Sequence, residues 1–420
     1  MNLKTVVIAV LFAFVINVEN VYAAGFSLYE WGARGTSMGG TMLGRADDPS
    51  AVAYNPAGIT QLEGLQTMIG VSMVAPSGKI ETPGETTSIK TNYFFPPHAF
   101  LTYQMTDKAW LGLGLYTRFG LGTEYPDDWP GRYNTQFTRV QSLSLNPNIA
   151  YKLTDSLSLA LGAEVMWFDF FQEKAIVNSL APGLRAADID AELDGDSYGF
   201  GGNVALHYKP NDTWAVGLTY KSRVKHTIEG DAKFKNSPLP GFFENTSAEG
   251  DITLPDSFGA GIMFRPHEKV SLEANAIYTL WSTYDELKIK FGDPLNPLDP
   301  STDVTSADKK WRDVWRFQLG AEYDLNELID LRLGYVFDQI PDRDKYADYM
   351  TPTSDRHIIT TGVGFSWEKL NLDLSYSYLW FENRSIEARD SNGDGFTDIL
   401  DSRFKDGHTH LAGVSISYRF

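Results

Sequence analysis

The chain of 420 residues contains no cysteine. A protein without cysteine has no disulfide bonds, so its stability must come from elsewhere. Basic side chains are also scarce, since 36 Lys and Arg stand against 54 Asp and Glu, which gives a net charge of −18 at pH 7. Nucleic-acid phosphates are neutralised by Lys and Arg, so we expect no nucleic-acid partner.

Long apolar runs are absent after the first residues of the chain. The run from Val6 to Ile16 follows a single Lys and precedes small residues at Ala23 and Ala24, which is the layout of a secretory signal peptide. This run is too short to span a bilayer as a helix, which needs about 20 apolar residues. We therefore predict a signal peptide at residues 1–23 and no membrane-spanning helix after it.

The pattern that dominates the rest of the chain is alternation of apolar and polar residues. The segments "LSLALGAEVMW" from Leu157, "VSLEANAIY" from Val270 and "LNLDLSYSYLW" from Leu370 each place apolar side chains on one face and mostly small or polar ones on the other. Such segments are β-strands. The apolar face turns inward in a soluble sandwich and outward in a membrane barrel, and the period alone does not decide between them.

Three further features favour the barrel. The segments have about ten residues or more, which suits tilted membrane-spanning strands. Their apolar faces often end in Trp or Tyr, as an interfacial girdle requires. Short connectors, such as "TDK" at Thr106 and "LNEL" at Leu325, alternate with long ones near 76–92, 119–136, 175–197, 228–250, 292–308, 338–356 and 383–407.

This count predicts an all-β protein, a transmembrane antiparallel β-barrel of about 14 strands over residues 61–420, with both ends on the periplasmic side. The last strand ends at Phe420, and a terminal aromatic residue resembles the sorting signal of outer-membrane barrels. We therefore expect the outer membrane of a Gram-negative cell as the location. The expected partners are outer-membrane lipids and, during biogenesis, the barrel assembly machinery.

Residues 24–60 do not alternate and are rich in Gly and other small residues. A barrel of this size has a lumen that can hold an irregular segment, so we predict an N-terminal plug, or hatch, inside it. Asn55 precedes Pro56 and is therefore biased toward an extended or turn conformation. "NPAG" can equally be a simple turn before the first strand.

The start "AGF", the stretch "ADDPSAVAYNPA", "LPDSFGAG" from Leu254 and "WRDVWRFQLGAEY" from Trp311 resemble the FadL family of outer-membrane transporters of long-chain fatty acids, which has aromatic-hydrocarbon channels as relatives. The resemblance implies a 14-stranded barrel with an N-terminal hatch that imports hydrophobic molecules without ATP. It implies Phe26 in the substrate site and Asn55, Pro56 and Ala57 as a hatch motif. It also implies a kinked strand in "AWLGLGLYTRFGLG" from Ala109 and lateral exit of the substrate. The glycines of that strand would tolerate a kink, or they would leave room for the plug.

A fatty acid needs an apolar wall and a cation for its carboxylate. Trp315 and Phe317 belong to a lipid-facing set, so Arg312 and Arg316 should face inward, and the resemblance aligns Arg312 with a cationic substrate position. Lys174 faces inward if the alternation after Leu157 persists. The alternative is that these cations pair with lumen acids, and an uncharged hydrocarbon would need no cation.

The stretch "DSNGDGFTDILD" from Asp390 has the spacing of an EF-hand calcium loop. Gly395 stands where the sharp turn is needed, and Asp401 replaces the usual Glu. The alternative is a polar hairpin tip, because Asp, Asn and Gly dominate turns. We predict a structural Ca²⁺ in the last external loop, with these ligands: Asp390, Asn392, Asp394, the Phe396 carbonyl, Asp398 and Asp401.

Other functions are open at this point. An outer-membrane enzyme, such as a lipase, needs a nucleophile beside His, and Ser354, Asp355 and His357 are close in sequence without a known spacing. A diffusion porin would need an open lumen, which a plug argues against. Adhesion through the long loops is a further alternative. We expect a channel and no catalysis, with long-chain fatty acids as cargo and aromatic hydrocarbons as the alternative.

Overall fold

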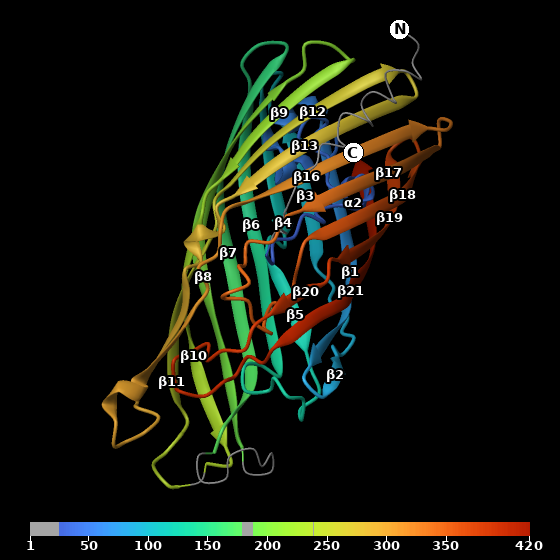
Figure 1. Cartoon of the computed structure of the whole chain (residues 1–420). Helices are drawn as coiled ribbons and strands as arrows, with labels where there is room; N and C mark the ends of the chain where they lie inside the picture. Colours follow the sequence, from blue (N-terminus) through green and yellow to red (C-terminus); the bar gives the residue numbers. More distant parts are fainter. Residues whose placement is uncertain (1–24, 179–187, 238) are drawn as a thin grey trace.

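The computed structural model describes residues 25–178, 188–237 and 239–420. The predicted signal peptide lies outside the described residues. The described strands form a closed antiparallel barrel of 14 strands (Figure 1). The last strand closes it by pairing with the first, with Gln66 opposite Arg419 at one end and Glu81 opposite Arg403 at the other. Fold class and strand number are therefore as the alternation predicts.

Several barrel strands are built from two segments separated by a break or bend. Two short segments, β2 and β20, pair with the outer ends of β1 and β21. The first ten segments are β1 (Leu65–Thr82), β2 (Glu85–Ser88), β3 (Pro97–Gln104), β4 (Ala109–Tyr116), β5 (Gly120–Glu124), β6 (Phe137–Lys152), β7 (Leu157–Ile176), β8 (Ile189–Tyr208), β9 (Trp214–Lys221) and β10 (Val224–Lys235). The others are β11 (Thr246–Leu254), β12 (Ser257–His267), β13 (Val270–Thr279), β14 (Glu286–Phe291), β15 (Val304–Asp308), β16 (Val314–Asp324), β17 (Ile329–Asp338), β18 (Arg356–Ser366), β19 (Leu370–Phe381), β20 (Arg384–Ile386) and β21 (Ser402–Arg419).

The two ends of the barrel differ in their connectors, as predicted. Short turns join β3 to β4, β6 to β7, β8 to β9, β12 to β13, β16 to β17 and β18 to β19, and the long connections lie at the opposite end. The strands run further into the predicted loops than the sequence indicates, because β7 continues to Ile176 and β8 begins at Ile189. Short η-helices interrupt two connections, η3 (Trp281–Thr283) and η4 (Pro300–Asp303). Among the described residues, no helix has the length and apolar content needed to cross a membrane.

The strand faces follow the predicted parity. On β7, Ser158, Ala160 and Glu164 are buried, whereas Leu161 of the opposite face is 51% exposed. The same holds on β19, where Asp373, Ser375 and Ser377 are buried and Leu374, Tyr376 and Tyr378 are exposed. The apolar side chains therefore point outward, and polar ones line the interior.

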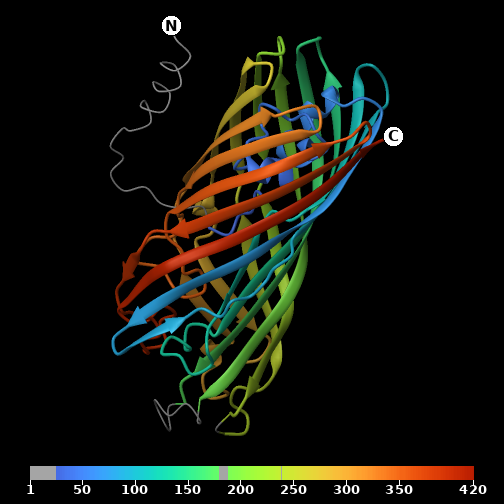
Figure 2. The same ribbon diagram turned by 90° about the vertical axis from the view of Figure 1, so that its right-hand side faces the viewer.

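Residues Gly25–Leu62, here called the N-terminal segment, are almost wholly buried and lie toward the end of the barrel with the short turns (Figures 1 and 2). The segment contains α2 (Ala33–Ser37), α3 (Ala51–Tyr54) and η1 (Pro56–Gln61). It hydrogen-bonds to strands on several sides of the barrel. These bonds are Ala33 N to Ser415 Oγ at 2.8 Å, Thr360 Oγ1 to Ser37 O at 2.9 Å, Gly44 N to Glu273 Oε1 at 2.8 Å and Asn55 Nδ2 to Leu206 O at 3.1 Å.

The long connections pack together at the opposite end. Trp129 is 1% exposed and stacks on Tyr125 with ring centroids 3.9 Å apart, and Tyr349 contacts it edge to face. Ile386, Ile399 and Phe404 complete this apolar cluster. The connections that contribute to this cluster therefore pack around an apolar core of their own.

Candidate functional site

The third strand of the barrel is broken between β4 and β5, at Thr117–Phe119. Here the N-terminal segment takes over part of the pairing, because Leu28 N donates to Arg118 O at 2.8 Å and Gly120 N donates to Phe26 O at 3.0 Å. The break therefore coincides with the strand in which the family resemblance implies a kink.

Other backbone groups at the break are bonded by side chains. The Trp31 indole N–H donates to Thr117 O at 2.8 Å. The Ser142 hydroxyl both accepts from Phe119 N at 3.0 Å and donates to Phe119 O at 2.8 Å. The bend is thus built into the packing of the wall.

The glycines before the break have a different role. A Cβ added at Gly112 would lie 2.9 Å from Val52 Cγ2, and one at Gly114 would lie 3.0 Å from Val52 Cγ1. These two glycines therefore leave room for the N-terminal segment, which is the second of the two interpretations the sequence allows.

A gap in the wall, here called the window, lies between residues 91–97 and 117–123. On the side of the short turns, β3 and β4 pair from His98 opposite Tyr116 onward. On the side of the external loops, Lys90 N donates to Glu124 O at 2.7 Å. Between these two points β5 pairs with β6 and forms no ladder with the second strand.

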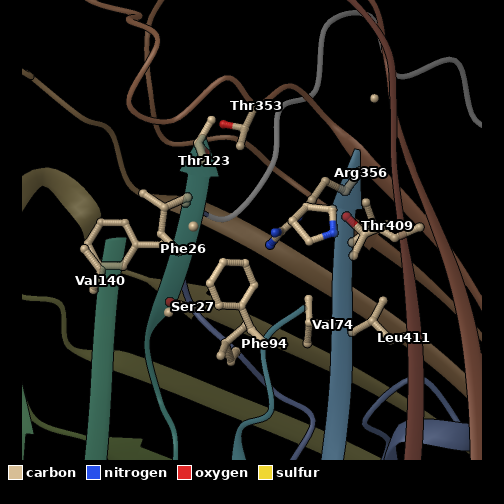
Figure 3. A pocket seen from close by; sticks show the side chains of 18 of the residues that line it. Phe26, Ser27, Val74, Phe94, Thr123, Val140, Thr353, Arg356, Thr409 and Leu411 are labelled. Carbon is tan, nitrogen blue, oxygen red and sulfur yellow. The ribbon is translucent and has the colours of Figure 1, made fainter. Parts of the chain in front are cut away.

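A cavity of about 350 Å³ lies behind the window. Figure 3 shows Phe26, Val74, Phe94, Val140 and Leu411 around it. Its lining comes from the N-terminal segment, from both sides of the window, from the external loops, and from Leu143 and Trp167, which belong to the outward faces of β6 and β7. The cavity thus connects the barrel interior with the lipid-facing side.

Two arginines share one carboxylate at this cavity. Arg316 Nη1 and Arg356 Nη2 each lie 2.6 Å from Asp338 Oδ2, and both arginines line the cavity. Asp338 is fully buried, and Arg316 also stacks on the Tyr29 ring at 4.5 Å. Arg316 Nε, Arg356 Nε and Asp338 Oδ1 have no hydrogen-bond partner among the described residues. These three side chains carry two positive charges and one negative, and Glu30, which also lines the cavity, adds a negative charge near Arg316. The guanidinium groups of Arg316 and Arg356 are the charged donors that an anion in the cavity would meet.

Phe26 lies in an aromatic cluster at the inner end of the cavity. Its ring centroid is 4.7 Å from Trp281, 5.7 Å from Trp311 and 6.0 Å from Phe119. Phe26, Leu121 and Val140 also line a second, apolar cavity of about 60 Å³. Phe26 therefore stands between two apolar spaces.

Arg312 and Lys174 lie elsewhere. Arg312 precedes β16, its Nε donates to Ile340 O at 3.3 Å, and it lines neither cavity. Lys174, on β7, lines neither cavity and lies within the electrostatic reach of Asp394 and Asp398. Of the three predicted cations, the structure brings only Arg316 to the cavity among the residues it describes.

Arg356, Asp338 and Phe94 are the site residues that sequence reasoning missed. Arg356 shares the inward parity of Ile358 and Thr360, so alternation along that strand would have found it. Asp338 shares the inward parity of Val336 in the same way. Phe94 lies in an irregular stretch with no period to read.

Two charged groups of the external loops have shifted pKa values. Burial first, and then the charge of Glu382, raise the pKa of Asp355 to about 8, against the opposing effect of Arg312. Burial alone would lower the pKa of Lys309, but Asp348, Tyr284 and Asp342 together outweigh burial and raise it.

The residues Asn55, Pro56 and Ala57 form a tight junction between α3 and η1. Asn55 Nδ2 donates to Leu43 O at 2.7 Å, and Asn55 Oδ1 accepts from Ala57 N at 3.2 Å. Asn55 is fully buried and also bonds Leu206 O of β8, so it ties two parts of the N-terminal segment to the wall.

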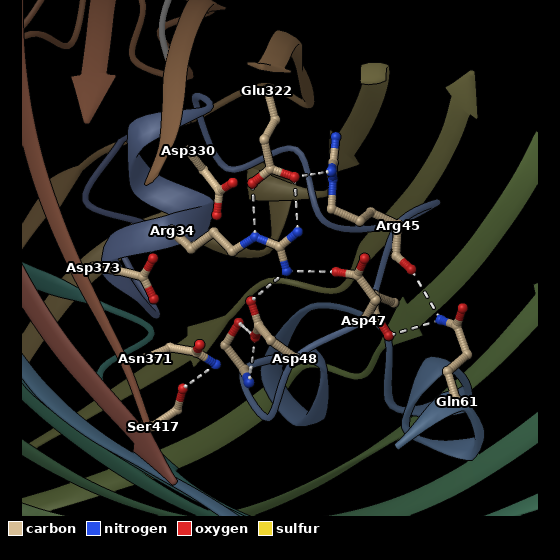
Figure 4. A network of polar contacts seen from close by, with 12 residues as sticks. Arg34, Arg45, Asp47, Asp48, Gln61, Glu322, Asp330, Asn371, Asp373 and Ser417 are labelled. Atoms are coloured by element: carbon tan, nitrogen blue, oxygen red, sulfur yellow. Dashed lines mark hydrogen bonds and ion pairs between the residues drawn. The ribbon is translucent and has the colours of Figure 1, made fainter. Parts of the chain in front are cut away.

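A second link between the N-terminal segment and the wall is ionic (Figure 4). Arg34 forms a bidentate pair with Glu322 at 2.9 Å and contacts Asp47 at 2.7 Å. Glu322 also accepts from Arg45 at 2.6 Å and from Arg332 at 2.7 Å. One wall carboxylate therefore holds two arginines of the segment.

The predicted calcium loop is an exposed turn with a buried end. Asp390 accepts backbone N–H bonds from Gly393 and Gly395 at 2.7 Å, and Asp394 accepts one from Phe396 at 2.8 Å. These first ligands are close in the chain and solvent-facing. Within the described ranges no group of three or more His, Cys, Asp and Glu gathers as a metal site.

The second half of that loop is hydrogen-bonded to the first half and to neighbouring segments, because Asp398 Oδ1 accepts from Ser391 N at 2.7 Å. Asp398 Oδ2 accepts from Asn134 Nδ2 at 3.0 Å, and Asp401 Oδ1 accepts from Ala388 N at 2.8 Å. Ca²⁺ binding by all six predicted ligands would therefore compete with these hydrogen bonds. The calcium site stays a prediction.

Residues 15–420 match the family described as outer membrane protein transport protein (OMPP1/FadL/TodX). A putative outer membrane protein of Neisseria meningitidis serogroup B is 26% identical, with 96% of each chain covered. A long-chain fatty acid transport protein of Escherichia coli O6:H1 is 25% identical, with 95% of each covered.

Solved structures share the fold. A Pseudomonas aeruginosa FadL homologue superimposes with a TM-score of 0.83 at 18% identity, over 94% of this chain and 99% of that one. The Pseudomonas putida toluene transporter TodX gives 0.71 at 19% identity, over 94% and 99%. The match over nearly the whole sequence places this chain in the OMPP1/FadL/TodX family of outer-membrane transport proteins for hydrophobic compounds.

Proposed function

We propose that this protein takes up long-chain fatty acids across the outer membrane without an energy source. The acyl chain binds in the 350 Å³ cavity, the carboxylate lies against Arg316 and Arg356, and the molecule leaves sideways through the window. The N-terminal segment serves as the hatch that closes the passage toward the periplasm.

The observation that carries this proposal is the pair of arginines on one buried aspartate at the edge of an apolar cavity. Each methylene that leaves water contributes about 0.8 kcal/mol, so the chain supplies most of the affinity. A carboxylate taken out of water needs charged donors to offset its desolvation, and the guanidinium groups of Arg316 and Arg356, which line the cavity, are such donors. A site for an uncharged hydrocarbon has no need of them.

The test compares ligands that differ only in charge. Hexadecanoic acid and hexadecanol are titrated into the purified full chain in detergent, for the wild type and for Arg356→Gln. A hydrogen bond to a charged group contributes about 1.5–3 kcal/mol, so the variant should bind the acid about 10- to 100-fold more weakly. Its affinity for the alcohol should not change. Arg316 keeps Asp338 in this variant, so folding is preserved.

The matched control is Arg139→Gln, a cation on the outward face of β6 that pairs with Asp169. It should leave both affinities as they are. Equal affinity of the wild type for the acid and the alcohol, with no effect of Arg356→Gln, would exclude carboxylate recognition at this site.

Aromatic hydrocarbons are the second candidate cargo. The apolar second cavity and the ring cluster around Phe26 favour small aromatic molecules, and the solved relative TodX is a toluene transporter. Binding of toluene together with no binding of hexadecanoic acid would favour this alternative. The residues Ser354 and His357 give no support to a hydrolase, because Ser354 Oγ donates to Glu382 O and His357 Nδ1 bonds the outward-facing Tyr335 hydroxyl.

A further inference from the structure

The backbone of Phe94 is committed to the first strand of the barrel. Val74 N donates to Phe94 O at 2.8 Å, and Phe94 N donates to Val74 O at 3.0 Å. Phe94 therefore offers no backbone donor or acceptor toward β5 on the other side of the window. Pro96 and Pro97, which follow it, have no N–H to donate. Residues 94, 96 and 97 therefore have no free backbone N–H with which to form a ladder with β5.

The Phe94 side chain spans the window and reaches β5 on the other side, although the Phe94 backbone does not pair with β5. A Cβ added at Gly122 of β5 would lie 1.9 Å from Phe94 Cζ and 2.6 Å from Cε1 and Cε2. The ring therefore lies directly on the backbone of Gly122. Figure 3 shows it pointing into the cavity between Ser27 and Val74.

The frame around this ring is fixed while the ring itself is held by packing. The window is closed toward the external loops by the Lys90 N to Glu124 O bond and by the Lys90 Nζ to Glu124 ion pair at 2.9 Å. It is closed toward the short turns by the ladder that starts at His98 and Tyr116. Phe94 is half-buried, and its neighbour Phe95 is 60% exposed on the lipid side. A turn of one side chain would therefore change the opening without breaking a backbone bond.

We propose that Phe94 is the gate of the window and that its seat on Gly122 sets the width of the molecules that leave sideways. The proposal rests on the proposed function, since it assumes that cargo passes from the cavity to the bilayer. A linear acyl chain needs only a small displacement of the Phe94 side chain, whereas a cargo with a bulky ring system needs that side chain to move away from Gly122.

The experiment measures lateral release directly. The full chain is placed in phospholipid nanodiscs that contain nitroxide-labelled lipid and is loaded with cis-parinaric acid, a fluorescent linear fatty acid. Quenching then reports transfer from protein to bilayer. Phe94→Ala should release the probe about tenfold faster than the wild type, which corresponds to about 1.4 kcal/mol of barrier. A fatty acid that carries a terminal pyrene should gain more than the linear probe.

Two further variants keep the test independent of a folding defect. Gly122→Ala forces the ring from its seat and should accelerate release in the presence of Phe94, but it should have no effect in the Phe94→Ala background. Tyr93→Ala removes an aromatic residue that is 61% exposed and does not line the cavity, so it should behave as the wild type.

The outcomes separate the gate from the function. A wild type that loads and releases the probe at the same rate as Phe94→Ala would overturn the gate and leave the proposed function standing. Additive effects of Phe94→Ala and Gly122→Ala would also overturn it. A wild type that takes up no probe would instead contradict the proposed function.

Discussion

Arg34→Met tests whether the ionic link holds the N-terminal segment in the barrel. The guanidinium of Arg34 lies between the wall carboxylate Glu322 and the segment's own Asp47 and Asp48, at 2.9, 2.7 and 3.4 Å. Methionine keeps most of the side-chain length and removes the charge. The carboxylates of Asp47 and Asp48 then face that of Glu322 without the cation between them.

The expected cost follows from the burial of these groups. Loss of one partner of a buried ion pair destabilises a protein by about 3–5 kcal/mol. The side chains of Arg34 and Asp47 are 16% and 34% exposed, and Glu322 keeps Arg45 and Arg332, so we expect the lower end, about 3 kcal/mol.

The effect should depend on pH in a defined direction. Burial alone would raise the pKa of Asp47, but Arg34 and then Arg45 outweigh burial and hold its pKa below the usual value. A carboxyl group with a lowered pKa contributes stability above its unfolded pKa of about 3.9 and loses it as the pH falls through the folded pKa. The difference between wild type and Arg34→Met should therefore be full at pH 7 and shrink below about pH 4.

The difference in unfolding free energy is measured by guanidinium-induced unfolding of the detergent-solubilised protein, followed by tryptophan fluorescence at pH 7 and below about pH 4. Arg223→Met is the matched control, because Arg223 is 56% exposed and pairs with Asp256 within the wall. It should cost less than about 1 kcal/mol. A loss in Arg34→Met no larger than in this control, or one that does not change with pH, would refute the ionic link.

Two more outcomes concern the external loops. Calorimetric titration of the whole protein should show binding of Ca²⁺ with a dissociation constant in the range of about 10⁻⁴–10⁻³ M, and Asp394→Ala should abolish the heat; a wild type without heat would rule out the site. The raised pKa of Asp355, about 8, means that its contribution to stability is highest below the unfolded pKa of about 3.9 and falls as the pH rises to about 8. In the same unfolding assay, Asp355→Asn should therefore be more stable relative to the wild type at pH 9 than it is at pH 5. Identical pH profiles of the two proteins would contradict the raised pKa of Asp355.

The parts of the fold that were predictable from the sequence are those set by local alternation. Side chains of a strand alternate with a period of two, so the outward set of Trp315 and Phe317 fixed the inward direction of Arg316. Arg312 escaped this reasoning because the strand begins only at Val314, which pairs with Thr279. Where a strand begins depends on its partner strand, which a single segment does not reveal.

The window and the contact between Phe94 and Gly122 could not be predicted from local sequence patterns either, because they too depend on segments that are distant in the sequence. Gly122 reads as a small residue in a strand, and Phe94 reads as an aromatic residue in a loop. Their contact joins the connection between β2 and β3 to β5, and the two form no ladder at these positions, so no periodicity relates them. The same holds for the calcium loop, where spacing predicts six ligands but does not show that Asp398 bonds Asn134 or that Asp401 bonds Ala388.

The N-terminal segment and the window are parts of one structure. At the break in the third strand, Thr117 O, Arg118 O and Gly120 N bond to the segment through Trp31, Leu28 and Phe26. Without the segment these three groups would lose these partners. In a wall that faces lipid, an unsatisfied backbone group costs several kcal/mol. The break is therefore stable only while the segment is in place, so loss of the segment would remove the support of the window as well as unblock the lumen.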